Sequence, residues 1–155
     1  MHIIIVGCGR WGSELAQLLA HEGHNVVVID KNPKSFSRLG ADFNGLTIAG
    51  IGFDPDVLKK AGIEKADVLA AVTNGDNSNI MIAQIAKKIF KVPKVVVRIF
   101  DPARAHIYQQ FGLDTICSTT IGANLVKNII LEKETAVEFP IGKDMISIKF
   151  KKGKA

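Results

Sequence analysis

The chain has 155 residues, 47% of them hydrophobic and 23% charged, a balance that excludes a disordered or fibrous protein and predicts one main globular domain. The net charge of +5 is concentrated at the end, because five lysines and one aspartate within 143–155 contribute +4 of it. A charge run at a terminus is typical of a solvated end, so we expect no nucleic-acid partner. The longest run without a charged residue, 115–126, is shorter than the roughly 20 residues of a membrane-spanning helix. The N-terminus also lacks the pattern of a signal peptide, so we expect a cytoplasmic protein.

Short runs rich in isoleucine and valine alternate with amphipathic stretches along the chain, which is the rhythm of βαβ units. The runs predict strands over 3–6, 26–29, 46–49, 68–72, 95–99 and 115–117. Most of them are apolar at successive positions, so helices must cover both faces of the sheet. We therefore predict an α/β fold, a Rossmann-like doubly wound parallel sheet of about six strands with helices on both faces.

Proline and aspartate mark where the predicted helices begin. Pro33, Pro55 and Pro102 stand where first helical turns are expected, and Asp54 and Asp101 precede two of them as N-caps. Gly23, Gly62 and Gly112 stand where the predicted helices end.

A helix predicted over 121–133 has apolar residues on more than one side. At 100° per residue they cover an arc of about 260°, whereas a helix lying on one sheet needs a stripe of only ~100°. The wide arc indicates a second buried face, and a partner subunit is the expected surface.

The pattern changes after Glu134, where Ile146, Ile148 and Phe150 alternate with polar residues and predict a half-buried strand. We predict a main domain over 1–134 and a short, basic, strand-like tail over 135–155. The tail strand could add to the main sheet, pair with another chain or begin a further domain.

The segment 7–12 reads G-x-G-x-x-G, directly after the first strand and at the start of a helix predicted over 10–22. Asp30 ends the second strand 18 residues beyond Gly12, close to the spacing of the dinucleotide-binding fingerprint. Gly7 allows the tight turn, Gly9 lets a diphosphate approach the backbone, and Gly12 lets the helix pack closely. Asp30 can accept hydrogen bonds from both ribose hydroxyls and repels a 2′-phosphate, so we expect NAD or a plain adenosine nucleotide and disfavour NADP.

Two arginines are candidate phosphate ligands. Arg10 lies inside the glycine loop, and Arg98 interrupts a buried strand near its carboxyl end, where ligands bind in open α/β sheets. The turn 74–77 lies at the same edge, and its asparagines fit a turn with an N-cap as well as a ligand contact. Trp11 is more typical of packing than of stacking on a ligand, and Cys8 occupies a loop position that needs a small residue. No catalytic set of histidine, serine, cysteine and carboxylate emerges from the spacing.

Three other protein classes share parts of this pattern. A methyltransferase also has a glycine loop, but its first strand usually ends in an acidic residue, where Val6 stands here. A small NAD-dependent oxidoreductase needs a substrate domain and a proton donor, and we find neither in this sequence. A DNA-bound redox sensor needs a DNA-reading module, for which 155 residues leave no room. The oxidoreductase and the NADH redox sensor are kept as the alternative function.

Several segments together resemble one family: 7–12 with its internal arginine, 28–31, 66–74, 97–98 and 111–114. They are similar to the nucleotide-binding N-terminal domain of Trk/Ktr-type potassium-uptake regulators, the RCK or KTN domain, from Met1 to about residue 132. The chain departs from the family at Ile51, where many members have an aspartate, and at Ser118, where proline is common. Only about 20 residues follow Glu134, so we expect no full C-terminal regulatory lobe.

The resemblance implies a non-enzymatic gating subunit that binds ATP, ADP, AMP, NAD or NADH. The two cysteines, Cys8 and Cys117, stand at no metal-ligand spacing, so we expect no metal. The resemblance further implies a homodimer that assembles into a ring, usually an octamer, and is attached to a membrane potassium transporter at the inner face of the membrane. The site residues that we predict are Gly7, Cys8, Gly9, Arg10, Trp11, Gly12, Asp30, Lys31, Gly50, Ile51, Thr73, Asn74, Asn77 and Arg98.

Overall fold

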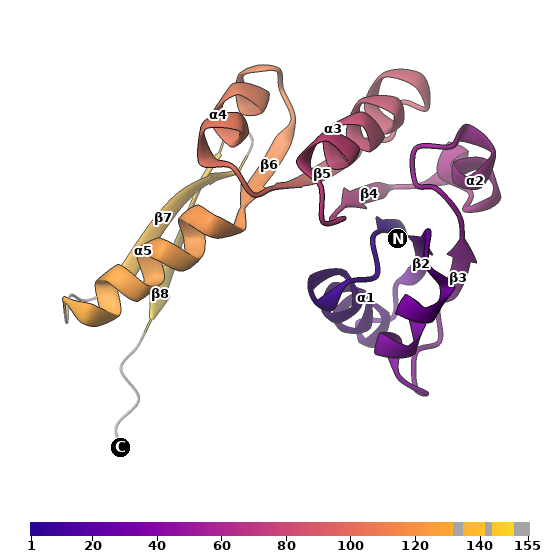
Figure 1. The fold of residues 1–155 in the computed structure, drawn as a ribbon, viewed down its shortest axis with the longest axis horizontal. Helices are drawn as coiled ribbons and strands as arrows, with labels where there is room; N and C mark the ends of the chain where they lie inside the picture. The colour runs from indigo at the N-terminus through magenta and orange to yellow at the C-terminus, as the bar shows by residue number, and fades with distance from the viewer. Residues whose placement is uncertain (132–134, 142–143, 151–155) are drawn as a thin grey trace. The chain divides into compact units, whose positions relative to one another are not determined.

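A computed structural model describes residues 1–131, 135–141 and 144–150. The chain divides into two units, Met1–Arg98 and Ile99–Ala155, which are described separately (Figure 1). None of the helices in the described ranges is long and apolar enough to cross a bilayer.

The first unit alternates strands and helices in the predicted rhythm. Its elements are β1 (His2–Val6), α1 (Arg10–His21), β2 (Asn25–Asp30), the 3-10 helix η1 (Pro33–Leu39), β3 (Leu46–Ala49), α2 (Pro55–Lys60), the 3-10 helix η2 (Ile63–Lys65), β4 (Val68–Ala71), α3 (Asp76–Gln84), the π-helical turn η3 (Ile85–Ile89) and β5 (Lys94–Ile99).

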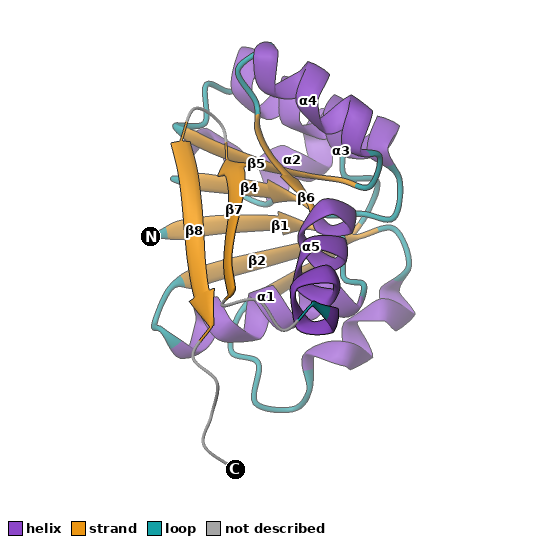
Figure 2. Cartoon of the chain, turned by 90° about the vertical axis from the view of Figure 1, so that its left-hand side faces the viewer, coloured by secondary structure: helices purple, strands orange, loops and turns teal. Residues whose placement is uncertain are grey.

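The strand order is β3-β2-β1-β4-β5-β6, where β6 spans Asp114–Cys117, and the registers of β1 to β5 are all parallel (Figure 2). Ile3 on β1 pairs with Val26 on one side and with Val68 on the other. This confirms the predicted Rossmann-like α/β fold. The order reverses between β1 and β4, and in open sheets of this kind ligands bind at the carboxyl ends of the strands beside that point.

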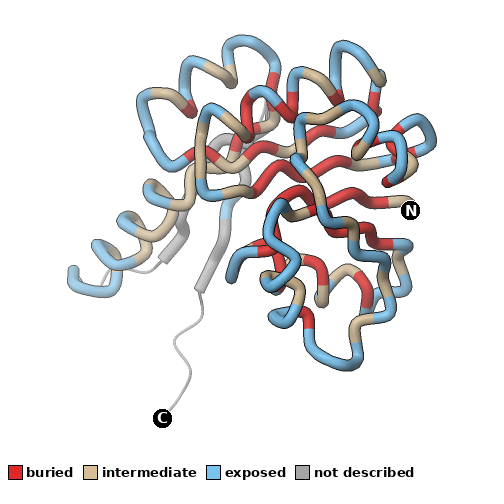
Figure 3. The backbone as a smooth tube through the Cα atoms, turned by 45° about the vertical axis from the view of Figure 1, so that its right-hand side comes forward, coloured by how far each residue is buried: buried red, intermediate tan, exposed pale blue. Residues whose placement is uncertain are grey.

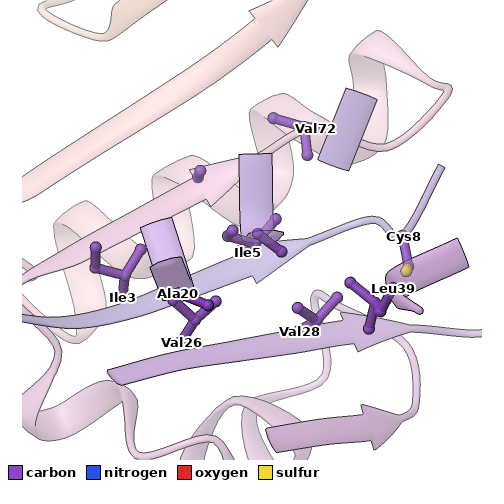
Figure 4. Packing of buried hydrophobic residues seen from close by; sticks show 10 residues of the cluster. Ile3, Ile5, Cys8, Ala20, Val26, Val28, Leu39 and Val72 are labelled. Carbon is purple, nitrogen blue, oxygen red and sulfur yellow. The ribbon is translucent and has the colours of Figure 1, made fainter. Parts of the chain in front are cut away.

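The central strands are buried on both faces, which explains their continuous apolar runs (Figure 3). Ile3 and Ile5 of β1 pack in one cluster with Ala20 of α1 (Figure 4). On the opposite face, Val6 and Ile82 of α3 both lie beside the backbone of Gly52. Helices therefore cover both faces of the sheet, as predicted (Figure 1).

The helix starts follow the expected capping chemistry. The Asp54 carboxylate accepts the N–H of Asp56 at 2.8 Å, and the Asp101 carboxylate accepts the N–H of Ala103 at 2.9 Å. Pro33 does begin a helix, but η1 is a 3-10 helix capped by the side chain of Asn32. The glycines that end segments, Gly23, Gly62 and Gly112, all have positive φ.

The second unit contains α4 (Pro102–Gln110), β6 (Asp114–Cys117), α5 (Ser118–Ile130), β7 (Thr135–Ile141) and β8 (Asp144–Phe150). The helix predicted over 121–133 begins three residues earlier than expected, because Cys117 is extended and serves as its N-cap. In α5 no residue is buried, and Ile129 and Ile130 are 72% and 71% exposed.

The tail strand finds its partner within the chain. β7 and β8 form an antiparallel pair in which Val137 lies opposite Ile148. A hairpin was not among the arrangements that the sequence left open. The side chains of Ile146, Ile148 and Phe150, which we expect to be buried on one side, lie outside the described part of the structure. The lysines within 151–154 lie outside it as well.

Candidate functional site

A cavity of about 510 Å³ opens at the carboxyl ends of β1, β2 and β4 in the first unit. This is the edge where the fold predicts a ligand, and the volume lies within the range of small-molecule sites. The cavity is lined by Val6, Gly7, Gly9, Arg10, Ile29, Asp30, Lys31, Asn32, Ser35, Arg38, Gly50, Ile51, Gly52, Phe53, Val72, Thr73, Asn74, Ser78, Ile82 and Arg98.

The glycine loop forms one wall of the cavity, and its three glycines have different surroundings. Gly7 has φ of 110°, and a Cβ there would lie 2.9 Å from the backbone of Thr73. A Cβ on Gly12 would collide with the carbonyl of Gly7, so this glycine lets α1 approach the loop. A Cβ on Gly9 would meet no protein atom within 4 Å, because this glycine faces open space.

The first turn of α1 is suited to an anion. Gly9 is its N-cap and provides no side-chain hydrogen bond, and the turn contains no acidic residue. A helix N-terminus carries roughly half a positive charge and several N–H groups without intrahelical partners. This end of the cavity therefore favours phosphate groups.

Asp30 both borders the cavity and fixes the glycine loop. Its Oδ2 accepts the backbone N–H of Cys8 at 2.7 Å, and its Oδ1 accepts the N–H of Asn32 at 2.8 Å. Each carboxylate oxygen can accept more than one hydrogen bond, so capacity remains for ligand hydroxyls. The Asp30 carbonyl also accepts the N–H of Gly50 at 3.0 Å, which ties β2 to the far wall of the cavity.

The Cys8 side chain lies behind the loop and does not line the cavity. The residue is fully buried, and its thiol donates to the carbonyl of Ser35 at 3.4 Å. Burial raises the pKa of the Cys8 thiol, the negative charge of Asp30 raises it further, and Arg38 opposes both effects. The thiol is therefore protonated at neutral pH.

Cationic side chains outnumber acidic ones around the cavity. Among the described residues that line the cavity, four are basic, Arg10, Lys31, Arg38 and Arg98, whereas Asp30 alone is acidic. Arg38 was not predicted, because its place depends on how η1 folds back beside the glycine loop. The charge balance indicates a ligand with more than one negative charge.

Arg98 and Thr73 join the ends of β5 and β4. The guanidinium of Arg98 donates to the Thr73 carbonyl at 2.9 Å and lies 5.7 Å from the ring centroid of Trp11. Burial lowers the pKa of Arg98 and Asp76 partly offsets this, but an arginine stays charged in proteins. Trp11 therefore contacts Arg98 and lies outside the cavity lining.

The structure brings most of the predicted site residues to one cavity. The lining includes Gly7, Gly9, Arg10, Asp30, Lys31, Gly50, Ile51, Thr73, Asn74 and Arg98. Cys8, Trp11, Gly12 and Asn77 do not line it: the Cys8 thiol bonds to Ser35, Gly12 lies against the Gly7 carbonyl, Trp11 contacts Arg98, and Asn77 is exposed on α3. The sequence did not indicate Asn32, Ser35, Arg38, Gly52, Phe53 and Ser78, which lie in loops and short helices rather than in a recognisable motif.

The strand order, the glycine loop and the acidic residue at the end of β2 define a Rossmann-type domain. The chain belongs to the TrkA-N domain family, whose model matches residues 3–119. It is 54% identical over 118 residues to the Trk system potassium uptake protein TrkA of Streptomyces coelicolor, covering 76% of this chain and 53% of that protein. It is 36% identical over 110 residues to a TrkA homolog of Pyrococcus abyssi, covering 71% and 48%. The chain thus spans about half the length of these curated relatives.

Solved structures with the same fold contain bound nucleotides. The Shewanella denitrificans Kef C-terminal domain in its AMP-bound form matches with a TM-score of 0.74 and 24% identity, over 84% of this chain and 79% of that one. GsuK bound to ADP matches with a TM-score of 0.72 and 22% identity, over 84% and 34%. The GsuK channel bound to NAD matches with a TM-score of 0.69 and 16% identity, over 90% and 25%. At these identities the likeness establishes the fold.

Proposed function

We propose that this chain is the nucleotide-binding part of a regulatory subunit of a potassium uptake system. The observation that carries the proposal is the cavity itself, where the N-terminus of α1, four basic side chains and Asp30 meet. The relatives named for Trk potassium uptake support the assignment to a potassium uptake system. The structural neighbours bound to AMP, ADP and NAD support a nucleotide as the ligand. In this proposal the nucleotide-binding domain spans 1–134.

The lining residues divide the cavity into parts that fit the parts of an adenosine nucleotide. The first turn of α1 and Arg10 would hold the phosphates, and Asp30 would accept the ribose hydroxyls. Ile51 and Phe53 border the cavity and are 49% and 40% exposed, so they offer an apolar surface for the base. Asp30 disfavours the 2′-phosphate of NADP.

The proposed role is regulation without turnover, through the geometry of an assembly. Apolar side chains are exposed at Val126, Ile129 and Ile130 of α5 and at its C-cap Leu131, which supports the second apolar face expected for this helix. We propose that this face pairs with a second copy of the chain, and that the assembly acts at the cytoplasmic side of a membrane potassium transporter. A nucleotide shifts such an assembly only by the difference in its affinity for two states.

Thermal unfolding of the purified chain with ATP, ADP, AMP, NAD, NADH and NADPH tests the ligand. Binding at about 100 times the dissociation constant adds about 2.7 kcal/mol to the free energy of unfolding and raises Tm by several degrees. We expect shifts with the adenosine nucleotides or NAD and little with NADPH. A shift with NADH alone, accompanied by oxidation of NADH on a carbonyl substrate, supports the oxidoreductase instead. No shift with any of the six contradicts nucleotide binding.

A further inference from the structure

A buried asparagine on α3 fixes the side of the cavity formed by the ends of β4 and β5. Asn79 is fully buried, and its side chain makes four hydrogen bonds, as many as a side-chain amide can make. Its Oδ1 accepts the backbone N–H of Thr73 at 2.8 Å and the hydroxyl of Thr73 at 2.6 Å. Its Nδ2 donates to the carbonyls of Thr73 at 3.1 Å and of Arg98 at 2.8 Å.

The partners of Asn79 determine the direction of every proton in this network. Nδ2 faces two carbonyl oxygens, which only accept, and Oδ1 faces a backbone N–H, which only donates. Because Oδ1 carries no proton, the proton of the 2.6 Å bond belongs to the Thr73 hydroxyl. The other neighbours of this hydroxyl, the N–H and carbonyl of Gly75, lie at 3.4 Å and compete weakly.

This network leaves Thr73 with acceptors alone toward the cavity. Thr73 lines the cavity, but its amide proton and its hydroxyl proton both point to Asn79. Oγ1 has two lone pairs, and the N–H of Gly75 faces one of them at 3.4 Å, so one lone pair remains to accept a hydrogen bond from a ligand donor and to repel a phosphate oxygen. Thr73 therefore favours a hydroxyl-bearing group over a phosphate.

We propose that Asn79 is a positioning residue of the nucleotide site, which holds Thr73 as an acceptor for a ligand hydroxyl. If Asp30 on β2 holds the adenosine ribose and the start of α1 holds the phosphates, the part of the ligand beside Thr73, two residues after the end of β4, lies beyond the phosphates. In NAD that part is a second ribose, and in ATP it is a terminal phosphate. This inference rests on the proposed nucleotide binding and names the dinucleotide as the ligand class that fits the β4 end.

Calorimetric titration of the whole chain with NAD, ADP and ATP tests the proposal. Thr73→Val should weaken NAD binding about tenfold, whereas Thr73→Ser restores the hydroxyl and should keep it within about twofold. ADP has no second ribose and should change less than about twofold in both variants. Thr47→Val makes the same exchange at an exposed position on β3 outside the cavity, and should change none of the three affinities.

Asn79→Ala tests the positioning role itself, because it releases the Thr73 hydroxyl to donate toward the cavity. The affinity for ATP relative to NAD should rise about tenfold. If Asn79 only stabilises the fold, all three affinities fall by one common factor, and an unchanged ratio overturns the proposal. If Asn79→Ala does not fold, the comparison of Thr73→Val with Thr73→Ser tests the proposal, and equal NAD affinity of these two variants overturns it.

A wild-type chain that binds none of the three nucleotides refutes the proposed function, whereas binding with constant ratios refutes only the role of Asn79.

Discussion

The carboxylate of Asp30 at the end of β2 and the backbone N–H of Cys8 in the glycine loop are joined by a 2.7 Å hydrogen bond. The second carboxylate oxygen accepts the N–H of Asn32 at 2.8 Å. The residue that the sequence assigns to the ribose therefore also holds the loop that is assigned to the phosphates. Changes at Asp30 should affect stability and ligand binding together.

Asp30→Asn should lower the free energy of unfolding by about 1–2 kcal/mol in the absence of ligand. The amide has one acceptor oxygen and one NH₂ group, so it cannot satisfy the N–H groups of Cys8 and Asn32 as two oxygens do. Urea denaturation measures the change. Asp42→Asn, at an exposed aspartate outside the cavity, is the matched control and should change stability by less than about 0.5 kcal/mol. Equal stability of the two variants contradicts the loop-holding role.

Two glycine substitutions in one loop should have opposite consequences. Gly9→Ala should keep the fold within about 1 kcal/mol, because its φ of −76° suits alanine and its Cβ meets no protein atom. It should nevertheless weaken ADP binding at least about tenfold, because the methyl group occupies the space that a phosphate approaches. Gly12→Ala should lower stability by about 1–3 kcal/mol or more, since its Cβ collides with the Gly7 carbonyl.

Thermal unfolding and calorimetric titration of the two glycine variants separate these effects. A Gly9→Ala chain that binds ADP as tightly as the wild type shows that no phosphate approaches this face. A Gly12→Ala chain with wild-type stability shows that the helix and the loop are not closely packed.

The buried thiol of Cys8 should make stability fall at alkaline pH. Burial and Asp30 raise the pKa of this thiol above its ordinary value of 9.0, so the unfolded chain loses the proton at a lower pH than the folded chain. Below the unfolded pKa both states keep the proton and the thiol adds no pH dependence. Above it the free energy of unfolding falls, by at most about 1.4 kcal/mol per pH unit for one group. Denaturation between pH 8 and 10 should give a shallower slope for Cys8→Ala than for the wild type, and equal slopes contradict the assignment.

The exposed apolar face of α5 should control association. The double variant Ile129→Glu with Ile130→Glu places two charges on side chains that are 72% and 71% exposed, so the fold should be kept. We expect the wild type to have twice the chain mass of 16.8 kDa or a multiple of it, and the variant to have the mass of one chain. Light scattering after gel filtration measures both, with Lys127→Glu on the same helix as control. A wild-type chain that is monomeric at all concentrations contradicts the proposed pairing.

The sequence predicted the strands and the glycine loop because both depend on local chemistry. A strand buried on both faces must be apolar at successive residues, and the predicted strand residues 3–6 are all buried in β1. The bounds of β3, Leu46–Ala49, are also the predicted ones, although β3 is a mostly exposed edge strand. Asp54 and Asp101 were predictable as N-caps because the cap, the proline and the first turn are neighbours in sequence.

The missed parts of the site depend on distant segments that only the fold brings together. Asn79 matters because the end of β4, with Thr73, and the end of β5, with Arg98, meet beside α3. Arg38 reaches the cavity because η1 packs beside the loop that Asp30 holds, and no spacing rule encodes this. The hairpin of β7 and β8 was missed because its first strand contains Pro140, and a proline within a run argues against a strand even though Val137, Phe139 and Ile141 alternate with other residues.

The most direct test of the central claim is to follow the backbone amide resonances of the ¹⁵N-labelled chain while ADP is added. If phosphates bind at the start of α1, the amides of Gly9 and Arg10 should shift most, with the same concentration dependence as the amide of Lys31 beside Asp30. Amides outside the cavity, such as that of Ala86, should not move. Shifts confined to residues away from the glycine loop, or none at saturating ADP, contradict nucleotide binding in this cavity.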